Sequence, residues 1–367
     1  MATVIDADGH ITEPRAVWED YAEPAFRDSV IQLRQTADGR DETWIGGERR
    51  PHSNPAPASI PGAMSDLSRK WSWDDILPGG FDPAERVKVL DAEGFDQALL
   101  FPTIYLLFGD IRDPTVAAAT CRAYNDWLAD FCRHDPERLY GAGLVPLQDV
   151  DLAVRETERI ARLGLKAALI RPERFNGLAL QDPACQPFWA TAQDCNLAVA
   201  LHGSFGSRMP SFASQRYDNA FFTHMICHPF EQMASCLDVV CGGVLEAFPR
   251  LRVGFFESGL GWLSYWLARM DEHLESMARF TPWLSRKPSE MFREQCFISM
   301  DPDDGPALAE VAELGFESCV LFGSDYPHYD SVYPGALEEL ERSCSAVPAD
   351  VLQLVKLDNP RRFMGLA

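Results

Sequence analysis

The strongest constraint on the fold is a series of eight short apolar runs, separated by segments whose apolar residues have helical spacing. Most of these runs are continuously apolar, as expected for strands buried on both faces of a parallel sheet. Strands that alternate with helices predict a (β/α)8 TIM barrel, and a doubly wound open sheet is the structural alternative. No G-x-G-x-x-G pattern follows any run, which removes the usual dinucleotide-binding argument for the open sheet. The predicted strands are residues 4–8, 97–101, 140–145, 165–171, 197–202, 251–257, 296–300 and 319–324.

Start and stop signals mark the helices between these strands. In the first, Asp82 can cap, Pro83 fits the first helical position, Glu85 completes a capping box and Gly94 can end the helix. Similar signals predict helices over residues 115–134, 152–163, 231–248 and 349–357, the last ended by the pair Asn359-Pro360.

Residues 11–80 form a segment that is far too long for an ordinary loop between a strand and a helix. We expect one barrel domain over residues 1–367, with this segment as a folded insertion over the barrel mouth. The insertion is interpreted either as a substrate lid or as a dimerisation arm. In the lid interpretation, its tryptophans Trp71 and Trp73 contact the substrate.

The charge of the chain limits its partners. Lys and Arg number 33 against 55 Asp and Glu, which gives a formal net charge of −22. Such a field repels phosphate backbones and anionic lipids, so we expect a small-molecule substrate and neither nucleic acid nor membrane as a partner. No apolar run approaches the roughly 20 residues of a membrane span, and the first residues lack the pattern of a secretory signal, so a cytoplasmic protein is predicted. The ten scattered cysteines, without a C-x-x-C pair, are interpreted as buried free thiols.

Polar side chains stand at the ends of five predicted strands, where barrel enzymes carry their chemistry. A divalent cation requires carboxylates and neutral imidazoles that converge from several elements. Each of these residues alone is a weak signal, because Asp and His are common where strands end. Together they predict a metal site whose ligands are Asp8, His10, His202 and Asp325.

Three of these strand ends also carry a family resemblance. The sequences VIDADGH, LHG and FGSDYPH resemble those of the amidohydrolase superfamily. The similar branch includes aminocarboxymuconate semialdehyde decarboxylase, resorcylate-type decarboxylases and some ring or carbon–carbon hydrolases, and the resemblance extends over nearly the whole chain. It implies one divalent metal ion, with zinc expected first and manganese, iron or cobalt as alternatives. It also implies a homodimer.

Two positions depart from this branch. The family often has His or Glu where Asp8 stands, and it usually has a catalytic His after the sixth strand, where this chain has Glu257. We interpret Glu257 as a proton-transfer group, with a structural ion pair to Arg269 as the alternative. Two-metal members of the superfamily use a modified Lys after the fourth strand. Here Ile170 and Arg171 occupy that place, which favours a single metal.

Four further residues near the strand ends are candidates for the pocket. Arg171 can clamp a substrate carboxylate or form a structural ion pair. His224 and His228 have the i, i+4 spacing of a metal site, but Pro229 disfavours helix at His228. A pocket wall or a helix-entry role is therefore expected, with His228 the better candidate for contact with substrate. His328 follows Asp325 closely and is interpreted either as a proton-transfer group or as a hydrogen-bonded loop residue.

Two reactions fit these residues. The first is hydrolysis of a small cyclic or carboxylated substrate by metal-activated water, with Asp325 or Glu257 taking the proton. The alternative is non-oxidative decarboxylation of an aromatic or unsaturated acid, in which an acid protonates the carbon that loses CO2. A barrel that binds a ligand without turning it over is a third interpretation, and the acid–base residues around the predicted metal site argue against it.

Overall fold

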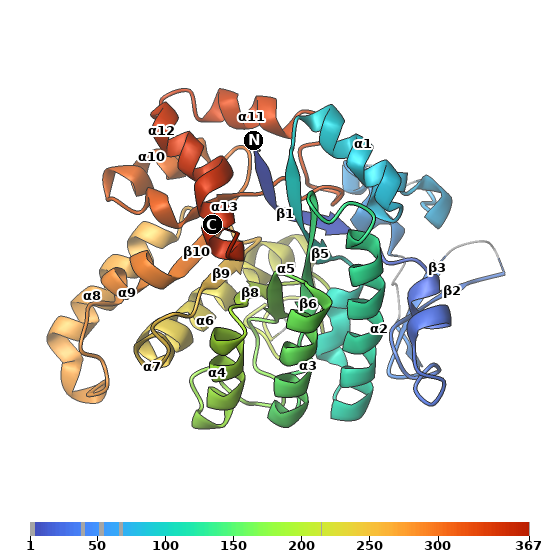
Figure 1. Cartoon of the computed structure of the whole chain (residues 1–367), viewed down its shortest axis with the longest axis horizontal. Coiled ribbons are helices and arrows are strands. Elements are labelled where there is room, and N and C mark those ends of the chain that lie inside the picture. Colours follow the sequence, from blue (N-terminus) through green and yellow to red (C-terminus); the bar gives the residue numbers. More distant parts are fainter. Residues whose placement is uncertain (1–3, 38–40, 51–54, 66–68, 214, 367) are drawn as a thin grey trace.

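The computed structural model describes residues 4–37, 41–50, 55–65, 69–213 and 215–366. Eight parallel strands stand side by side in the order β1-β5-β6-β7-β8-β9-β10-β11, with helices packed around them (Figure 1). This arrangement confirms the predicted TIM barrel. All eight predicted runs form its strands, which are β1 (Ile5–Ile11), β5 (Gln97–Pro102), β6 (Leu139–Leu144), β7 (Ala167–Ile170), β8 (Ala198–His202), β9 (Val253–Phe256), β10 (Cys296–Met300) and β11 (Val320–Phe322).

The first and last strands are joined by hydrogen bonds near their carboxyl ends. The backbone N–H of Asp325 donates to the carbonyl of Asp8 at 2.8 Å, and that of His10 donates to the carbonyl of Tyr326 at 2.6 Å. The register of β1 against β5 shifts between Asp6 and Gly9, as it does at a β-bulge. Bulges re-aim side chains at barrel rims, and this one contains the candidate ligand Asp8 and ends just before His10.

The helices follow the predicted signals closely. In α1 (Pro83–Glu93) the Asp82 carboxylate accepts the N–H groups of Ala84 and Glu85, and Gly94 ends the helix with φ +78°. The Asn359-Pro360 pair differs from the prediction, because a proline is tolerated in the first turn of a helix and here begins α13 instead of ending the helical segment. The other helices are α2 (Pro114–Cys132), α3 (Val150–Leu163), α4 (Gln186–Asp194), α5 (Ala220–Cys227), α6 (Pro229–Cys241), α7 (Val244–Ala247), α8 (Leu263–Met277), α9 (Pro288–Gln295), α10 (Gly305–Glu313), α11 (Ala336–Ser343), α12 (Ala349–Gln353) and α13 (Asn359–Met364).

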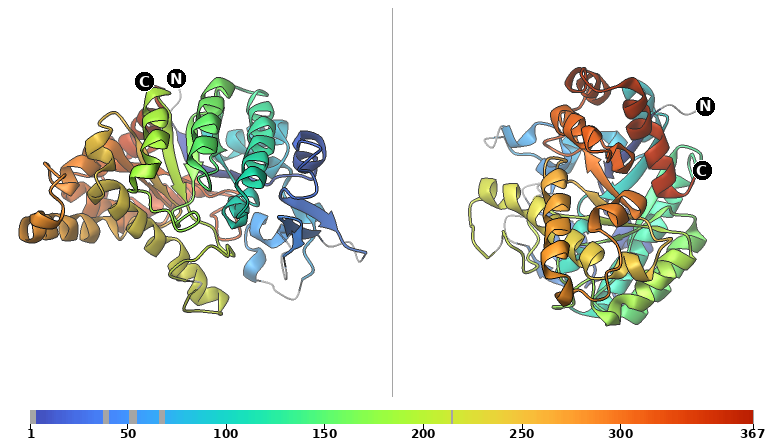
Figure 2. Two further views of the ribbon diagram at one scale, coloured as in Figure 1. Left: turned by 90° about the horizontal axis from the view of Figure 1, so that it is seen from below. Right: turned by 90° about the vertical axis from the view of Figure 1, so that its left-hand side faces the viewer.

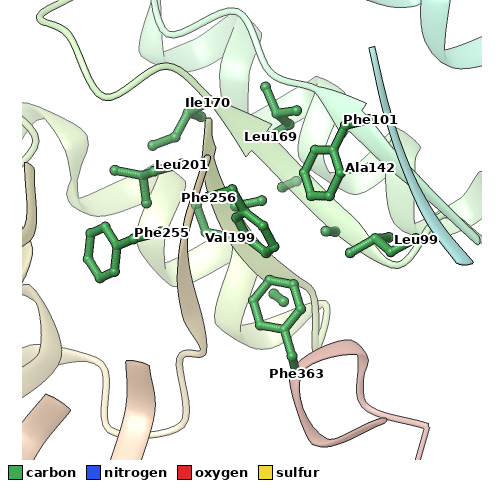
Figure 3. Packing of buried hydrophobic residues seen from close by; sticks show 14 of the residues in the cluster. Leu99, Phe101, Ala142, Leu169, Ile170, Val199, Leu201, Phe255, Phe256 and Phe363 are labelled. Carbon is green, nitrogen blue, oxygen red and sulfur yellow. The ribbon is translucent and has the colours of Figure 1, made fainter. Parts of the chain in front are cut away.

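Aliphatic and aromatic side chains pack together in the hydrophobic core of the barrel (Figure 3). The ring of Phe256 lies 4.8 Å from that of Phe101 and 5.4 Å from that of Phe363, centroid to centroid, and all three side chains are fully buried. Phe363 comes from α13, so the C-terminal helix completes the barrel core. The ring of Phe101 also lies 5.2 Å from that of His202, which places a close-packed aromatic layer directly against a candidate ligand.

The inserted segment forms a separate layer beside the barrel. It contains an antiparallel sheet of β2 (Gln32–Gln35), β3 (Asp41–Ile45) and β4 (Glu48–Arg49), followed by short 3₁₀ turns. Figure 2 shows the insertion, in blue, projecting from the same side of the barrel as the segment that carries α5. Backbone hydrogen bonds tie it to the loop after β11, since Tyr329 donates to Ala58 and accepts from Gly62. The lid and dimer-arm interpretations both stay predictions.

Two smaller expectations concern cysteines and membranes. All ten cysteines are free, and eight of them are buried. Over the residues that the structure describes, no helix has the length and apolarity that crossing a membrane would require.

Candidate metal centre and active site

Four side chains converge at the carboxyl ends of β1, β8 and β11. His10 Nε2 and His202 Nε2 lie 3.1 Å apart. Asp8 Oδ1 lies 3.6 Å from His10 Nε2 and 3.5 Å from His202 Nε2. Asp325 Oδ1 lies 3.3 Å from His10 Nε2. The structure therefore brings together all four residues that the sequence predicts as metal ligands.

The hydrogen bonds of this cluster orient its atoms for a cation. Nδ1 of His10 bonds to the carbonyl of Pro102 at 2.8 Å, and Nδ1 of His202 bonds to the carbonyl of Gly203 at 2.9 Å. Each Nδ1 must carry the proton in these bonds, so both Nε2 lone pairs face the centre, in the arrangement typical of metal-bound histidines. Asp8 Oδ1 is buried without a hydrogen-bond partner, and the buried Asp325 Oδ1 faces the imidazoles of His10 and His328. Two imidazoles and two carboxylate oxygens fit a divalent ion with mixed nitrogen and oxygen ligands.

The pKa shifts of the clustered residues also fit a bound cation. Burial, followed by the neighbouring carboxylates of Asp330 and Asp8, raises the pKa of Asp325 well above its ordinary value. Burial, together with His328, lowers the pKa of His10 well below its ordinary value, which keeps this imidazole neutral and able to ligate. Carboxylates that crowd one another in a buried site are stabilised by a nearby cation.

Two supporting residues hold the ligand strands, and sequence reasoning assigned a role to neither. Asp6 accepts hydrogen bonds from the backbone N–H of Ser324 at 2.9 Å and from its hydroxyl at 2.7 Å, which fixes the residue before Asp325. The buried Arg86 donates to the carbonyl of His10 at 2.7 Å. Arg86 lies in α1, where its only sequence signal is a charged residue within a helix.

Glu257 lies directly after β9 and links two histidines. Its Oε2 is 3.3 Å from His202 Nε2, and its Oε1 is 3.6 Å from His228 Nε2. Its backbone is left-handed, with φ +51°, and its N–H donates to the hydroxyl of Ser299 at 3.0 Å. Burial, followed by the charge of Asp325, raises the pKa of Glu257 well above its ordinary value. The alternative ion pair with Arg269 is not formed, because Arg269 lies exposed on the outer helix α8.

His328 is buried against the ligands rather than free in its loop. Its Nδ1 lies 2.7 Å from Asp325 Oδ1, its Nε2 lies 3.2 Å from the hydroxyl of Thr103, and its ring centroid lies 3.9 Å from that of His10. The backbone N–H of Thr103 is in turn held by the buried carboxylate of Glu13 at 3.1 Å. These contacts match the hydrogen-bonded interpretation of His328, and proton transfer by this residue stays a prediction.

A cavity of about 350 Å³ opens beside the cluster. Five of the residues that line the cavity are acidic, and no lining residue is Lys or Arg. No lining residue belongs to the inserted segment either, as far as that segment is described. The walls come from the loops after β9, β10 and β11 and from the junction of α5 and α6: His224, Met225, His228, Pro229, Glu257, Ser258, Gly259, Asp301, Pro302, Asp303, Ser324, Asp325, Asp330, Ser331 and Val332.

The remaining candidates take different places around this cavity. His224 and His228 both line it, and His228 stands between α5 and α6 because Pro229 begins a new helix, as predicted. Arg171 is fully buried and forms a two-pronged ion pair with Glu173, at 3.0 Å and 2.5 Å. This is the structural ion pair of its two interpretations, and contact of Arg171 with a substrate carboxylate stays a prediction.

Trp71 and Trp73 lie behind the cavity wall. Both pack in a small apolar cluster of the insertion that includes Ile60 and reaches Tyr329, the residue after His328. Tyr329 also contacts the ring of His224, with centroids 5.7 Å apart. Trp71 and Trp73 therefore share an apolar cluster with Tyr329, whose neighbour His224 lines the cavity, and their direct contact with substrate stays a prediction.

This contact chain predicts the effect of removing an indole ring. Trp73→Ala should raise KM several-fold and leave metal content unchanged, because the lost packing frees Tyr329 while the ligand cluster stays intact. Steady-state kinetics and elemental analysis of the purified variant measure both quantities. Trp44→Ala, in the β3 strand of the same insertion, is the control. Equal kinetics of both variants and the wild type would favour the dimer-arm interpretation.

Comparison with known proteins places this site in a family. The family model described as Amidohydrolase matches residues 5–366, which is nearly the whole chain. The chain belongs to the amidohydrolase family. Curated relatives include a 2-amino-3-carboxymuconate-6-semialdehyde decarboxylase from Dictyostelium discoideum, 24% identical over 78% of this chain and 77% of the relative. A gamma-resorcylate decarboxylase from Polaromonas sp. strain JS666 is 28% identical over 66% of this chain and 76% of the relative.

Solved structures share the barrel over its full length. An amidohydrolase from Mycobacterium avium subsp. paratuberculosis K-10 has a TM-score of 0.83 and 22% identity, with 99% of both chains covered. A dihydroxybenzoic acid decarboxylase from Polaromonas sp. JS666, with bound manganese and the inhibitor 2-nitroresorcinol, has a TM-score of 0.69 and 21% identity, with 100% of this chain and 98% of that chain covered. At these identities the likeness establishes the amidohydrolase fold.

Proposed function

We propose that this amidohydrolase-family protein is a metal-dependent, non-oxidative decarboxylase of an aromatic or unsaturated carboxylic acid. The observation that carries the proposal is that both curated relatives described above are decarboxylases, matched over most of their length. The relatives thus favour the alternative reaction over the hydrolysis expected first from the sequence. A cavity of about 350 Å³, with a proton donor on one wall, suits a single-ring substrate.

In this proposal each part of the site has one task. Asp8, His10, His202 and Asp325 hold a divalent ion, which when bound supplies positive charge for the substrate carboxylate and a neighbouring oxygen. His328 positions Asp325 through their 2.7 Å contact. His228 lines the cavity beside Glu257, with its Nε2 3.6 Å from Glu257 Oε1.

Glu257 is the proposed proton donor. Glu257 lines the cavity and can deliver a proton to the ring carbon that carries the carboxylate, and the burial of its carboxyl group raises its pKa in the direction of the neutral acid. The new carbon–hydrogen bond forms with that proton, the carbon–carboxylate bond breaks, and its electron pair stays on the ring while CO2 leaves. The carboxylate of Glu257 is then reprotonated from water through the open cavity. A glutamic acid thus takes the place that the branch usually gives to histidine.

The identity of the ion is a separate part of the proposal. Zinc stays the first expectation, and the bound manganese of the related dihydroxybenzoic acid decarboxylase supports manganese as the alternative. Two imidazoles with two carboxylates are acceptable ligands for either ion. Elemental analysis of protein purified without chelators distinguishes them.

A substrate panel tests the reaction. The metal-loaded protein is incubated with hydroxybenzoates, including 2,6-dihydroxybenzoate, and with lactones, while CO2 release and ring opening are followed separately. We expect CO2 from at least one hydroxybenzoate and no ring opening. Ring opening of a lactone without CO2 would make the protein a hydrolase. Tight binding of both classes without turnover would make it a ligand-binding barrel.

A further inference from the structure

A second group of ligand side chains lies on the cavity side of Glu257. The ligand atoms of His224, His228 and Glu257 all lie within 4.8 Å of one another, and the group shares only Glu257 with the surroundings of the first cluster. Glu257 presents one carboxylate oxygen to each group, Oε2 toward His202 at 3.3 Å and Oε1 toward His228 at 3.6 Å. The i, i+4 histidine pair thereby gains a carboxylate from a strand about thirty residues away, which sequence spacing could not show.

His228 supplies an independent sign that this position can bind a ligand. The residue is only 4% exposed, yet neither ring nitrogen has a hydrogen-bond partner. A buried imidazole nitrogen without a partner is costly, and such groups usually mark a site that another species completes. The ring packs closely on the backbone of Gly203. A side chain at this position would collide with the ring, because its Cβ atom would lie 2.5 Å from His228 Nδ1. The backbone of Gly203 therefore packs on Nδ1, while Nε2 faces Glu257 and the cavity.

The geometry is close to that of a transition-metal site. Bonds of about 2.0–2.1 Å at tetrahedral angles separate ligand atoms by about 3.3–3.5 Å, and the His228 Nε2 to Glu257 Oε1 distance is 3.6 Å. His224 is half-buried on α5, and its ligand atom lies within 4.8 Å of those of His228 and Glu257. Asp330 Oδ2, 3.6 Å from His224 Nε2, offers a fourth ligand atom. Two imidazoles and one glutamate form a donor set that zinc enzymes use, whereas magnesium and calcium prefer oxygen alone.

We propose that His224, His228 and Glu257 bind a second transition-metal ion of the zinc class, and that this ion inhibits the enzyme. An ion bound to Glu257 Oε1 occupies the carboxyl group that the proposed reaction uses as its proton donor, so excess metal stops protonation of the ring. The inhibition rests on the proposed function, whereas the binding of the second ion does not. The site is thus regulatory, weaker than the four-ligand site because it has fewer preformed contacts.

The test begins with metal stoichiometry. Metal-free protein is titrated with Zn²⁺ by calorimetry, and bound zinc is counted by elemental analysis after gel filtration. We expect two ions for the wild type, the second weaker than the first, and one ion for His224→Gln. His273→Gln is the matched control, because His273 is exposed on α8 and its Nδ1 bonds to the carbonyl of Arg269 outside the cavity. It should bind two ions.

Activity then tests the regulatory part on the same samples. With a substrate identified by CO2 release, wild-type activity should rise with the first equivalent of zinc and fall at least about tenfold in excess zinc. The fall should be absent from His224→Gln. His228→Gln is the second variant, in case the first does not fold, and circular dichroism checks both.

The outcomes distinguish the binding of a second ion from its regulatory role and from the proposed function. One zinc ion in the wild type over the whole titration, or two in both folded histidine variants, would overturn the second site. Two ions in the wild type and one in the variants, with equal inhibition by excess zinc in all, would overturn the regulatory role. Two ions without CO2 release from any acid would leave the site standing and remove the proposed function.

Discussion

Glu257→Gln should lower kcat by about 10²–10⁴-fold, the usual contribution of a general acid, while the content of the four-ligand metal site stays unchanged. The glutamine side chain has nearly the same shape and can adopt the same backbone, but it cannot deliver the proton. The loss of the proton donor should therefore lower kcat and leave substrate binding unchanged. The measurement is steady-state CO2 release, with elemental analysis of the same preparation.

A neighbouring acid in the same cavity wall is the control for this variant. Asp303→Asn removes one charge from an exposed residue of the lining and should change kcat by less than about twofold. If Glu257→Gln loses the metal of the four-ligand site, Glu257 is a ligand of that site. If it keeps full activity and melts at a lower temperature, its role is structural.

The barrel could be predicted because each strand is buried on both faces. Continuous apolar runs such as residues 197–202 leave no polar face, and only a sheet covered by helices accommodates eight of them. Helix ends were equally readable where a side chain caps them, as at Asp82. The prediction that the Asn359-Pro360 pair ends the helix is wrong, because a proline can begin a helix as well as follow one. The local sequence does not distinguish these two positions.

The metal ligands could be predicted because strand ends of a barrel meet at one rim. That rule places His202 beside His10 although 192 residues separate them. It does not state which way a side chain points within the rim. The approach of Glu257 to His228 depends on its left-handed backbone and on the α5–α6 junction, and neither leaves a periodic signal in the sequence.

Tertiary packing also sets contacts of charged side chains that the local sequence does not specify. Arg171 and Glu173 are two positions apart, a spacing with no preferred contact in a loop, and only the fold turns both inward to form an ion pair. Arg86 lies on a helix, where solvent exposure of a charged side chain is the default expectation. The hydrogen bond from Arg86 to the carbonyl of His10 requires α1 to cover the end of β1.

Asp325→Asn should reduce activity by more than about 10²-fold and lower the affinity of the four-ligand site for its ion. Asp325 contributes the anionic oxygen that faces His10 Nε2 at 3.3 Å, and replacing even a residue that only supports a metal ligand costs about 10–100-fold. Asparagine suits this position sterically, because the backbone has φ +55° and asparagine tolerates the left-handed region. A loss of activity in this variant is therefore caused by the missing negative charge of Asp325 and not by a strained backbone.

Chelation should reproduce the effect in the wild type and add a stability change. An ion present at about 100 times its Kd stabilises the folded state by about 2.7 kcal/mol, so its removal should lower Tm by several degrees and abolish CO2 release. Adding back one equivalent of zinc or manganese should restore both in the wild type and neither in Asp325→Asn. Asp330→Asn, a half-exposed acid on the same loop, should respond to chelation and add-back at the first site as the wild type does. Unchanged activity and Tm in chelated wild type, with no bound metal detectable, would contradict the metal site, because the buried Asp8 Oδ1 would then need another partner.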